Sequence, residues 1–273
     1  MRLSIITINR NNALGLKKTL QSVASQTFKG FEYIVIDGAS TDGSVEVVKE
    51  YEPRFAHLKW VSEPDSGIYN AMNKGIRMAS GDYIQILNSA DCLAAPDVTE
   101  RMLAALEKAG NPSMLYGNMV KCFPDGRRLV DKGFAGQEIT MLGMYVGTLN
   151  HDPAYIRRDL FEKYGYYDEN LKIVSDWKWY LQAIIFGGEK PQYVDLDVTL
   201  FDMTGISETN KELDKAERKQ VLEQLLPNAV LSDYERYAVS IDQIKRLKRH
   251  LWAYRIVWFL ERCLFKLEKR KQK

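Results

Sequence analysis

Short apolar runs recur along the first part of the chain, and each ends abruptly in polar residues. These runs predict buried strands over residues 3–9, 32–37, 58–61 and 83–87. Between them, apolar residues recur at helical spacing, as in Leu16, Leu20 and Val23, and predict helices that pack on a sheet. Helix-capping residues precede three of these segments, at Asn11-Asn12, Asp42 and Asp65. This alternation of strands and helices predicts a parallel sheet with right-handed crossovers.

The polar residues at the strand ends predict a ligand site. Asn9 and Asp37 end the first two strands, and Asn88-Ser89-Ala90-Asp91 follows the strand over 83–87. Because parallel strands present their carboxyl ends at one edge of the sheet, these residues are expected to line one crevice. A carboxylate at such an edge suits a hard cation that is bridged to phosphate.

The pattern changes after residue 113. Two strand-like runs, 114–120 and 127–130, are joined through Pro124-Asp125-Gly126 and predict a hairpin. The glycine-rich segment 133–150 has weak periodicity and predicts a mobile loop near the site. Helices are also expected over 97–109, 160–164 and 176–186 and from 211 onward, and a strand over 193–196. Pro96 is expected as the first residue of the helix over 97–109.

Charge is distributed unevenly along the 273 residues. The net charge is +2, but residues 241–273 hold eleven Lys or Arg and three Asp or Glu. Three widely spaced cysteines, without a metal-ligand pattern, predict free thiols in a reducing compartment. No apolar run reaches the length of a signal peptide or a membrane span, so a cytoplasmic protein is expected.

Several motifs in fixed order make the chain resemble a known family. These are Thr7-Ile8-Asn9, the segment Ile36 to Gly43, the segment Gly67 to Gly75, and the segment Gly81 to Asp91. Together they resemble family 2 glycosyltransferases with the GT-A fold over roughly residues 1–200. The resemblance implies an α/β fold with a GT-A type, Rossmann-like mixed sheet flanked by helices. It further implies a domain over 1–210, with a nucleotide-binding half at 1–112 and an acceptor-side half at 113–210. The resemblance does not cover the rest of the chain, where the charged helical pattern predicts a basic helical extension at 211–273.

The resemblance implies a nucleotide site. Its residues would be Thr7, Asn9, Asp37, Asp65, Asn73, Lys74 and Asn88. Asp37 matches the carboxylate that accepts the uracil N–H, and a carboxylate selects a base edge that offers a donor. Structural alternatives remain open: Asp37 as the start of a turn, Asp65 as a helix cap, and Lys74 as a solvated helix lysine.

The resemblance also implies a divalent cation, Mn²⁺ or Mg²⁺, bound by Asp91 against the donor diphosphate. Family members have an Asp-x-Asp-like cluster here, whereas only the final acid is present in Asn88-Ser89-Ala90-Asp91. One carboxylate can suffice, because Mg²⁺ keeps waters and takes other ligands from phosphates. The alternative is that Asp91 caps the loop before Pro96.

Asp176 matches the catalytic base of inverting members, although Ser175 replaces the acid that usually precedes it. An inverting transfer needs one carboxylate to remove the proton of the acceptor hydroxyl. The alternative, which is compatible with catalysis, is that Asp176 caps the helix that follows. His151 and Trp177 are candidates for contacts with phosphate or acceptor, and a structural role is the alternative for each.

These features predict an inverting transfer of a hexosyl or N-acetylhexosaminyl group. The donor would be UDP-linked, the acceptor a glycan or lipid-linked sugar, and the setting surface polysaccharide biosynthesis. The alternative is a degenerate domain that binds nucleotide or glycan without turnover. The chain lacks the glycine-rich turn of dinucleotide enzymes, a P-loop and any nucleic-acid recognition motif. The basic amphipathic tail over 241–273 predicts docking on the inner face of the plasma membrane, and its alternative is packing on the domain or in a homo-oligomer.

Overall fold

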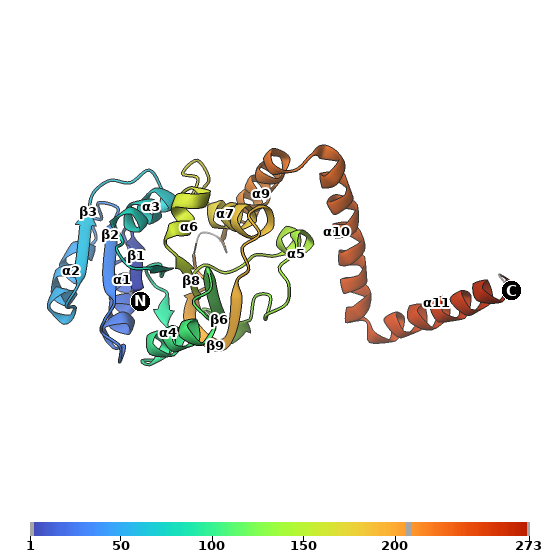
Figure 1. Ribbon diagram of the computed structural model, residues 1–273, viewed down its shortest axis with the longest axis horizontal. Helices are drawn as coiled ribbons and strands as arrows, with labels where there is room; N and C mark the ends of the chain where they lie inside the picture. The colour runs from blue at the N-terminus through green and yellow to red at the C-terminus, as the bar shows by residue number, and fades with distance from the viewer. Residues whose placement is uncertain (1–2, 206–208, 272–273) are drawn as a thin grey trace. The chain divides into compact units, whose positions relative to one another are not determined.

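The computed structural model describes residues 3–205 and 209–271. The chain divides into two compact units, Met1–Lys219 and Gln220–Lys273. The first unit combines a sheet with flanking helices, and the second is helical (Figure 1). Helix α9 (Lys211–Leu225) crosses the boundary, so the first unit extends beyond residue 210 into the predicted extension.

The strands are β1 Leu3–Asn9, β2 Glu32–Asp37, β3 Leu58–Ser62, β4 Tyr83–Ile86, β5 Cys92–Leu93, β6 Met114–Cys122, β7 Arg128–Asp131, β8 Ala154–Arg157 and β9 Gln192–Asp202. The helices before α9 are α1 Ala13–Ala24, α2 Ser44–Tyr51, the 3-10 helix η1 Glu52–Arg54, α3 Ile68–Met78, α4 Val98–Lys108, α5 Met141–Val146, α6 Asp159–Tyr164, α7 Ser175–Tyr180 and the π-helix η2 Leu181–Phe186. Helices α10 Asn228–Arg249 and α11 Leu251–Lys271 follow in the second unit.

In the described part of the chain, nine strands form one sheet in the order β3-β2-β1-β4-β8-β6-β9-β5, with β7 paired to β6. The strands β1 to β4 are parallel, as predicted. Strand β8 runs antiparallel to its neighbours β4 and β6, and β6 is parallel to β9. The predicted mixed α/β sheet is therefore confirmed, and the carboxyl ends of β1 and β4 lie side by side.

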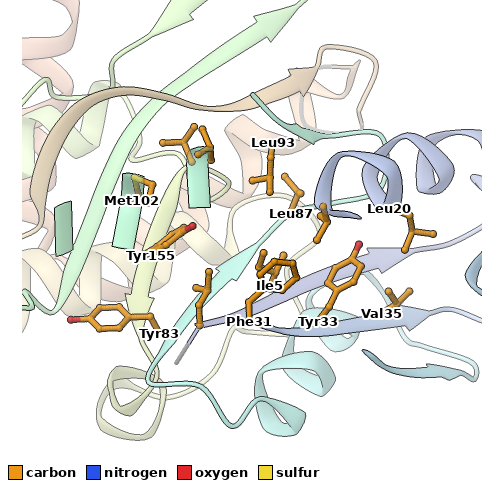
Figure 2. Packing of buried hydrophobic residues seen from close by; sticks show 14 of the residues in the cluster. Ile5, Leu20, Phe31, Tyr33, Val35, Tyr83, Leu87, Leu93, Met102 and Tyr155 are labelled. Atoms are coloured by element: carbon orange, nitrogen blue, oxygen red, sulfur yellow. The ribbon is translucent and has the colours of Figure 1, made fainter. Parts of the chain in front are cut away.

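Alternate residues of β1 face opposite sides of the sheet, as the period of a strand requires. Ile5 belongs to the buried cluster that joins α1, α2 and α4 to one face (Figure 2). Ile6 faces α3, where a Cβ at Gly75 would lie 2.4 Å from Ile6 Cγ2. Glycine is therefore required at position 75 for α3 to approach β1 this closely.

Two predicted helix starts are corrected. Helix α4 begins at Val98 with Asp97 in the cap position, so the prediction that Pro96 is its first residue is wrong. Asp42 lies one residue before Gly43, the cap residue of α2. Its carboxylate accepts the N–H of Ser44 at 3.1 Å and that of Ala13 at 2.8 Å, and so it joins the first residues of two helices.

Three predictions beyond residue 113 also differ from the structure. The segment 133–150 contains helix α5, which Trp177 holds by donating from Nε1 to the carbonyl of Met144 at 2.8 Å. The strand predicted over 193–196 is longer, because β9 continues along β6 to Asp202. Strand β8 is absent from the predicted elements, since its four residues are too few to show a period. The predicted hairpin is confirmed as β6 and β7.

Candidate active site

One cavity of about 1260 Å³ opens at the carboxyl ends of β1 and β4. Its wall also includes the start of α3, the segment 143–152, the start of α7, the end of β9 and the first turns of α9. This is the edge at which open α/β sheets bind ligands. The volume is large enough for a ligand the size of a nucleotide sugar, because pockets for drug-sized ligands measure about 300–1,000 Å³.

The structure brings together seven of the predicted site residues on the cavity wall: Asn9, Asp65, Asn88, Asp91, His151, Asp176 and Trp177. Four others, Thr7, Asp37, Asn73 and Lys74, are not among the lining residues of this cavity.

Asp37 is fully buried, and it bonds a cavity residue, Asn9. Its carboxylate accepts hydrogen bonds from Asn9 Nδ2 at 2.8 Å, from the N–H and Oγ of Ser40, and from Ser62 Oγ. Burial raises the pKa of Asp37, but these hydrogen bonds outweigh burial and hold the pKa below its usual value. In this structure the ionised carboxylate therefore orients the amide of Asn9, which does line the cavity.

The other three residues outside the wall have structural partners. Thr7 Oγ1 shares a hydrogen bond with the hydroxyl of Tyr33 at 3.0 Å, inside the core. Asn73 is buried and bonds both the N–H and the carbonyl of Tyr167, which ties α3 to the segment before α7. Lys74 pairs with Glu63 at 2.8 Å. Its Nζ also donates to the carbonyl of Pro64 at 2.9 Å.

Asp65 is a cavity residue that also supports the start of α3. Its Oδ1 accepts the N–H of Gly67 at 3.1 Å, although Gly67 itself occupies the cap position. The same oxygen lies 3.4 Å from Arg10 Nη1. Asp65 therefore positions one of the cationic side chains on the wall, the others being Lys121, Lys172, Lys211 and Arg218. These cationic side chains can meet an anionic ligand such as a diphosphate, although seven aspartates of the described chain line the same wall.

A tight turn places Asp91 at the end of β4. The Asp91 N–H bonds the carbonyl of Asn88 at 3.1 Å, and Ala90 adopts a positive φ of 86°. Thr19 supports this turn, because its hydroxyl accepts the Ala90 N–H at 3.0 Å and donates to the Asp91 carbonyl at 2.7 Å. The Asp91 side chain accepts the N–H of Asp202 at 2.8 Å, which fixes it to the end of β9.

Asp176 lies in the first turn of α7 and is held by two partners. His151 Nδ1 is 3.0 Å from Asp176 Oδ2, and the hydroxyl of Tyr69, whose one hydrogen is shared with the carbonyl of Ile173, lies 3.0 Å from Asp176 Oδ1. Burial raises the pKa of Asp176, but the hydrogen bond and positive charge of His151 outweigh it, so the pKa lies below its usual value. Asp176 is therefore an ionised carboxylate at neutral pH.

His151 faces several carboxyl groups. Burial lowers the pKa of His151, but Asp152 and Asp176 outweigh burial and raise the pKa to about 9. At neutral pH it is an imidazolium that donates from both nitrogens. Its Nε2 lies 3.2 Å from Asn88 Nδ2, while Asn88 Oδ1 has no partner. A turned-over Asn88 amide places the oxygen toward Nε2 and satisfies both groups.

Sequence analysis missed Asp152, although it adjoins His151. Burial raises the pKa of Asp152, and burial together with Asp152 raises the pKa of Asp91. In the part of the chain that the structure describes, no group of three or more His, Cys, Asp or Glu side chains forms a ready metal site. The Asp91–Asp152 pair nevertheless fits a hard divalent cation, because carboxylate oxygens are its preferred ligands and phosphates supply others.

Sequence analysis also missed Glu217, a buried carboxylate of α9. It accepts the N–H groups of Lys172 at 2.7 Å and Ile173 at 2.9 Å, and that of Val174 at 3.3 Å. These three residues lead directly into the turn that carries Asp176. Nothing in the charged pattern of α9 singles out Glu217. Arg218, the next residue, places its guanidinium 4.5 Å above the ring of Trp177.

The fold is the GT-A fold of glycosyltransferases. Solved structures with this fold include Staphylococcus aureus TarS 1-349 in complex with UDP-GlcNAc, with a TM-score of 0.65 and 22% identity over 84% of this chain and 69% of that chain. The mannosyltransferase PcManGT from Pyrobaculum calidifontis, in complex with GDP-Man and Mn²⁺, has a TM-score of 0.59 and 16% identity over 79% of this chain and 61% of that chain.

Sequence comparison then identifies the family. The family described as glycosyl transferase family 2 matches residues 4–165. An uncharacterized glycosyltransferase of Mycobacterium tuberculosis is 35% identical over 211 residues, which cover 74% of this chain and 76% of that protein. The chain belongs to glycosyl transferase family 2.

Proposed function

We propose that this protein transfers one sugar, with inversion, from a UDP-linked donor to a hydroxyl group of a glycan or lipid-linked acceptor. The observation that carries the proposal is the half-buried, ionised carboxylate of Asp176 on the wall of the cavity that also holds Asp91 and Asn9. One carboxylate poised to take a proton is what a single displacement at an anomeric carbon requires.

In the proposed reaction, the acceptor oxygen attacks the anomeric carbon while Asp176 accepts the acceptor proton. The bond from that carbon to the diphosphate oxygen breaks, and UDP leaves with the bonding electrons. Inversion follows, because no covalent sugar–enzyme bond intervenes. Tyr69 and His151 each bond one oxygen of Asp176 and fix the direction of its lone pairs.

Donor binding is supported by the residues around the strand ends. Asn9, which Asp37 orients, and the Asp65–Arg10 pair lie on the cavity wall. A structure with the same fold carries UDP-GlcNAc, which makes a UDP-linked hexose or N-acetylhexosamine the first donor class to test. Lys172 and Arg218 offer positive charge to the diphosphate.

Mn²⁺ or Mg²⁺ is the proposed cofactor, held by Asp91. PcManGT, which shares the fold, was solved with Mn²⁺. When bound, the ion neutralises the charge that develops on the departing diphosphate. The protein side chains align the acceptor and accept its proton, as described above.

A panel of nucleotide sugars tests the proposed function. Thermal unfolding with UDP-, GDP-, CMP- and dTDP-sugars should show stabilisation by a UDP-sugar, because a ligand that binds only the folded state raises Tm. Release of UDP in the presence of acceptor sugars should follow for the same donor. Stabilisation without turnover on any acceptor would favour a binding domain, and no response to any nucleotide would contradict the donor assignment.

A pH profile tests the pairing of His151 with Asp176. In His151→Gln the amide can still donate a hydrogen bond, but the positive charge is lost, so the pKa of Asp176 should rise. The acid limb of kcat/KM should therefore move to higher pH. His57→Gln, at an exposed histidine, is the matched control and should keep the wild-type profile. An unmoved acid limb in His151→Gln would contradict the pairing.

We assign residues 1–112 to donor binding and 113–210 to the acceptor side. The three free cysteines fit a reducing compartment.

We further propose that α11 docks on the inner face of an anionic membrane. In the described chain no helix is long and apolar enough to cross a bilayer. Helix α11 exposes large apolar side chains, including Trp252, Ile256, Trp258, Phe259 and Leu264. Its basic residues suit anionic headgroups, at about 1 kcal/mol for each charge near the surface.

Vesicle flotation tests the membrane proposal. The protein should float with anionic vesicles at moderate salt, and Trp252→Glu/Phe259→Glu should stay at the bottom because two exposed apolar groups become acidic. Leu14→Glu, which changes an 81% exposed leucine on α1, is the control and should float. If the wild type does not float, the proposal is wrong, and a molar mass that rises with concentration would favour a homo-oligomer.

A further inference from the structure

Asp152 is a buried carboxylate with an unused acceptor on the cavity wall. It is 1% exposed, and its Oδ1 has no hydrogen-bond partner among the described residues. Its carboxyl group lies within hydrogen-bonding reach of Asp91, and both residues line the cavity. A carboxylate oxygen buried this deeply without a hydrogen bond is costly unless a positive charge or a proton lies beside it.

His151 alone does not balance the charge of this cluster. Its Nε2 lies 3.4 Å from Asp152 Oδ1, but its Nδ1 bonds Asp176, and Asp91 is a third carboxyl group in the same cluster. One imidazolium cannot pair with all three carboxyl groups, so Asp91 and Asp152 must share a proton or a cation. A divalent cation between Asp91 and Asp152 would neutralise them, and carboxylate oxygens are the ligands that such a cation prefers.

We propose that Asp152 is a second carboxylate ligand of the divalent cation held by Asp91. This inference rests on the proposed function and goes beyond it, because it assigns the cation to two segments far apart in sequence. The turn after β4 carries Asn88 and Ala90 where acids would add charge. Asp152 supplies that missing charge from the start of the segment leading into β8, and the remaining ligands are waters and diphosphate oxygens.

The test measures cation binding directly. The full-length protein is saturated with UDP, and Mn²⁺ is titrated while free Mn²⁺ is followed by electron paramagnetic resonance. Asp152→Asn should weaken Mn²⁺ binding about tenfold or more, since even a loss of outer-shell partners costs about 10–100-fold. UDP affinity in EDTA should remain at the wild-type value. Asp131→Asn removes a cavity-wall acid paired with Lys121 and should leave Mn²⁺ affinity unchanged.

A ligand swap guards against a folding defect in Asp152→Asn. Asp152→Cys should shift the preference from Mn²⁺ toward Zn²⁺, because a thiolate is a softer ligand than a carboxylate. A purely structural residue would not change metal preference in this way, so the shift supports ligation. If Asp152→Asn binds Mn²⁺ as tightly as the wild type and Asp152→Cys keeps its preference, the inference is overturned.

The failure of this inference can be distinguished from failure of the proposed function. Wild-type protein that binds UDP and Mn²⁺, with unchanged binding in Asp152→Asn, overturns only the role of Asp152. Wild-type protein that binds UDP but no Mn²⁺ overturns the inference and the proposed cofactor together. Wild-type protein that binds neither overturns both the inference and the proposed donor.

Discussion

Asp176→Asn is expected to lower kcat by about a hundredfold or more, the scale of general acid–base catalysis. Asparagine has nearly the same shape and keeps an oxygen for the Tyr69 hydroxyl, so the local structure should persist. The amide cannot take the acceptor proton, and the loss should therefore fall on kcat. Steady-state kinetics with the donor and acceptor identified by the panel would measure it, and UDP affinity should stay near wild type.

Asp168→Asn provides the matched control. Asp168 lies between α6 and α7, shortly before Asp176. It pairs with Lys178 at 2.6 Å and does not line the cavity. Its loss should leave kcat within a few-fold of wild type. If Asp176→Asn retains transfer activity within a factor of about three, Asp176 is not the base.

Asp91→Ala should abolish the part of donor binding that depends on a divalent cation. The proposed contact runs from the carboxylate through the ion to the diphosphate, so UDP should bind wild type more tightly with Mn²⁺ than with EDTA. In the variant the two affinities should converge on the wild-type EDTA value. Isothermal titration of UDP under both conditions measures this difference.

The structure of the turn makes this experiment interpretable. Thr19 bonds the backbone of Ala90 and Asp91, so that support does not depend on the Asp91 side chain. The Asp91 side chain itself bonds the N–H of Asp202. The variant Thr19→Val removes the supporting hydroxyl but keeps the Asp91 carboxylate, so it reports the effect of damage to the turn alone. In this variant, part of the gain in UDP affinity that Mn²⁺ causes should survive. Equal UDP affinity of the wild type in EDTA and Mn²⁺ would contradict the metal assignment.

Elements with a clear local period were predictable from sequence. Strands β1 and β2 are short, mostly apolar segments that end in polar residues, and α1 repeats Leu16, Leu20 and Val23 on one face. Such patterns reflect burial on one face or on both, which is a local property of the chain. The polar residues Asn9 and Asp91 could be placed together because parallel strands share an edge.

The direction of side chains within these elements was not predictable to the same degree. Asp37 ends a strand, as expected, yet four neighbouring donors hold its carboxylate outside the cavity wall, where it bonds Asn9. Lys74 lies on the predicted helix, but its partner is Glu63. A strand or helix register sets which face a residue occupies, and the groups available on that face come from the rest of the fold.

By itself, the sequence determined the parallel core of the sheet and the polar strand ends; it also predicted His151 as a candidate contact and, through family resemblance, Asp176 as the candidate base. Only the tertiary structure decided that Asp152 lies beside Asp91 and that Glu217 binds the backbone before Asp176. The contact from Glu217 to Lys172 spans 45 residues, and the one from Asp91 to Asp202 spans 111. A local pattern carries no record of such pairs, because they form when separate segments pack together and bury polar groups that must then find partners.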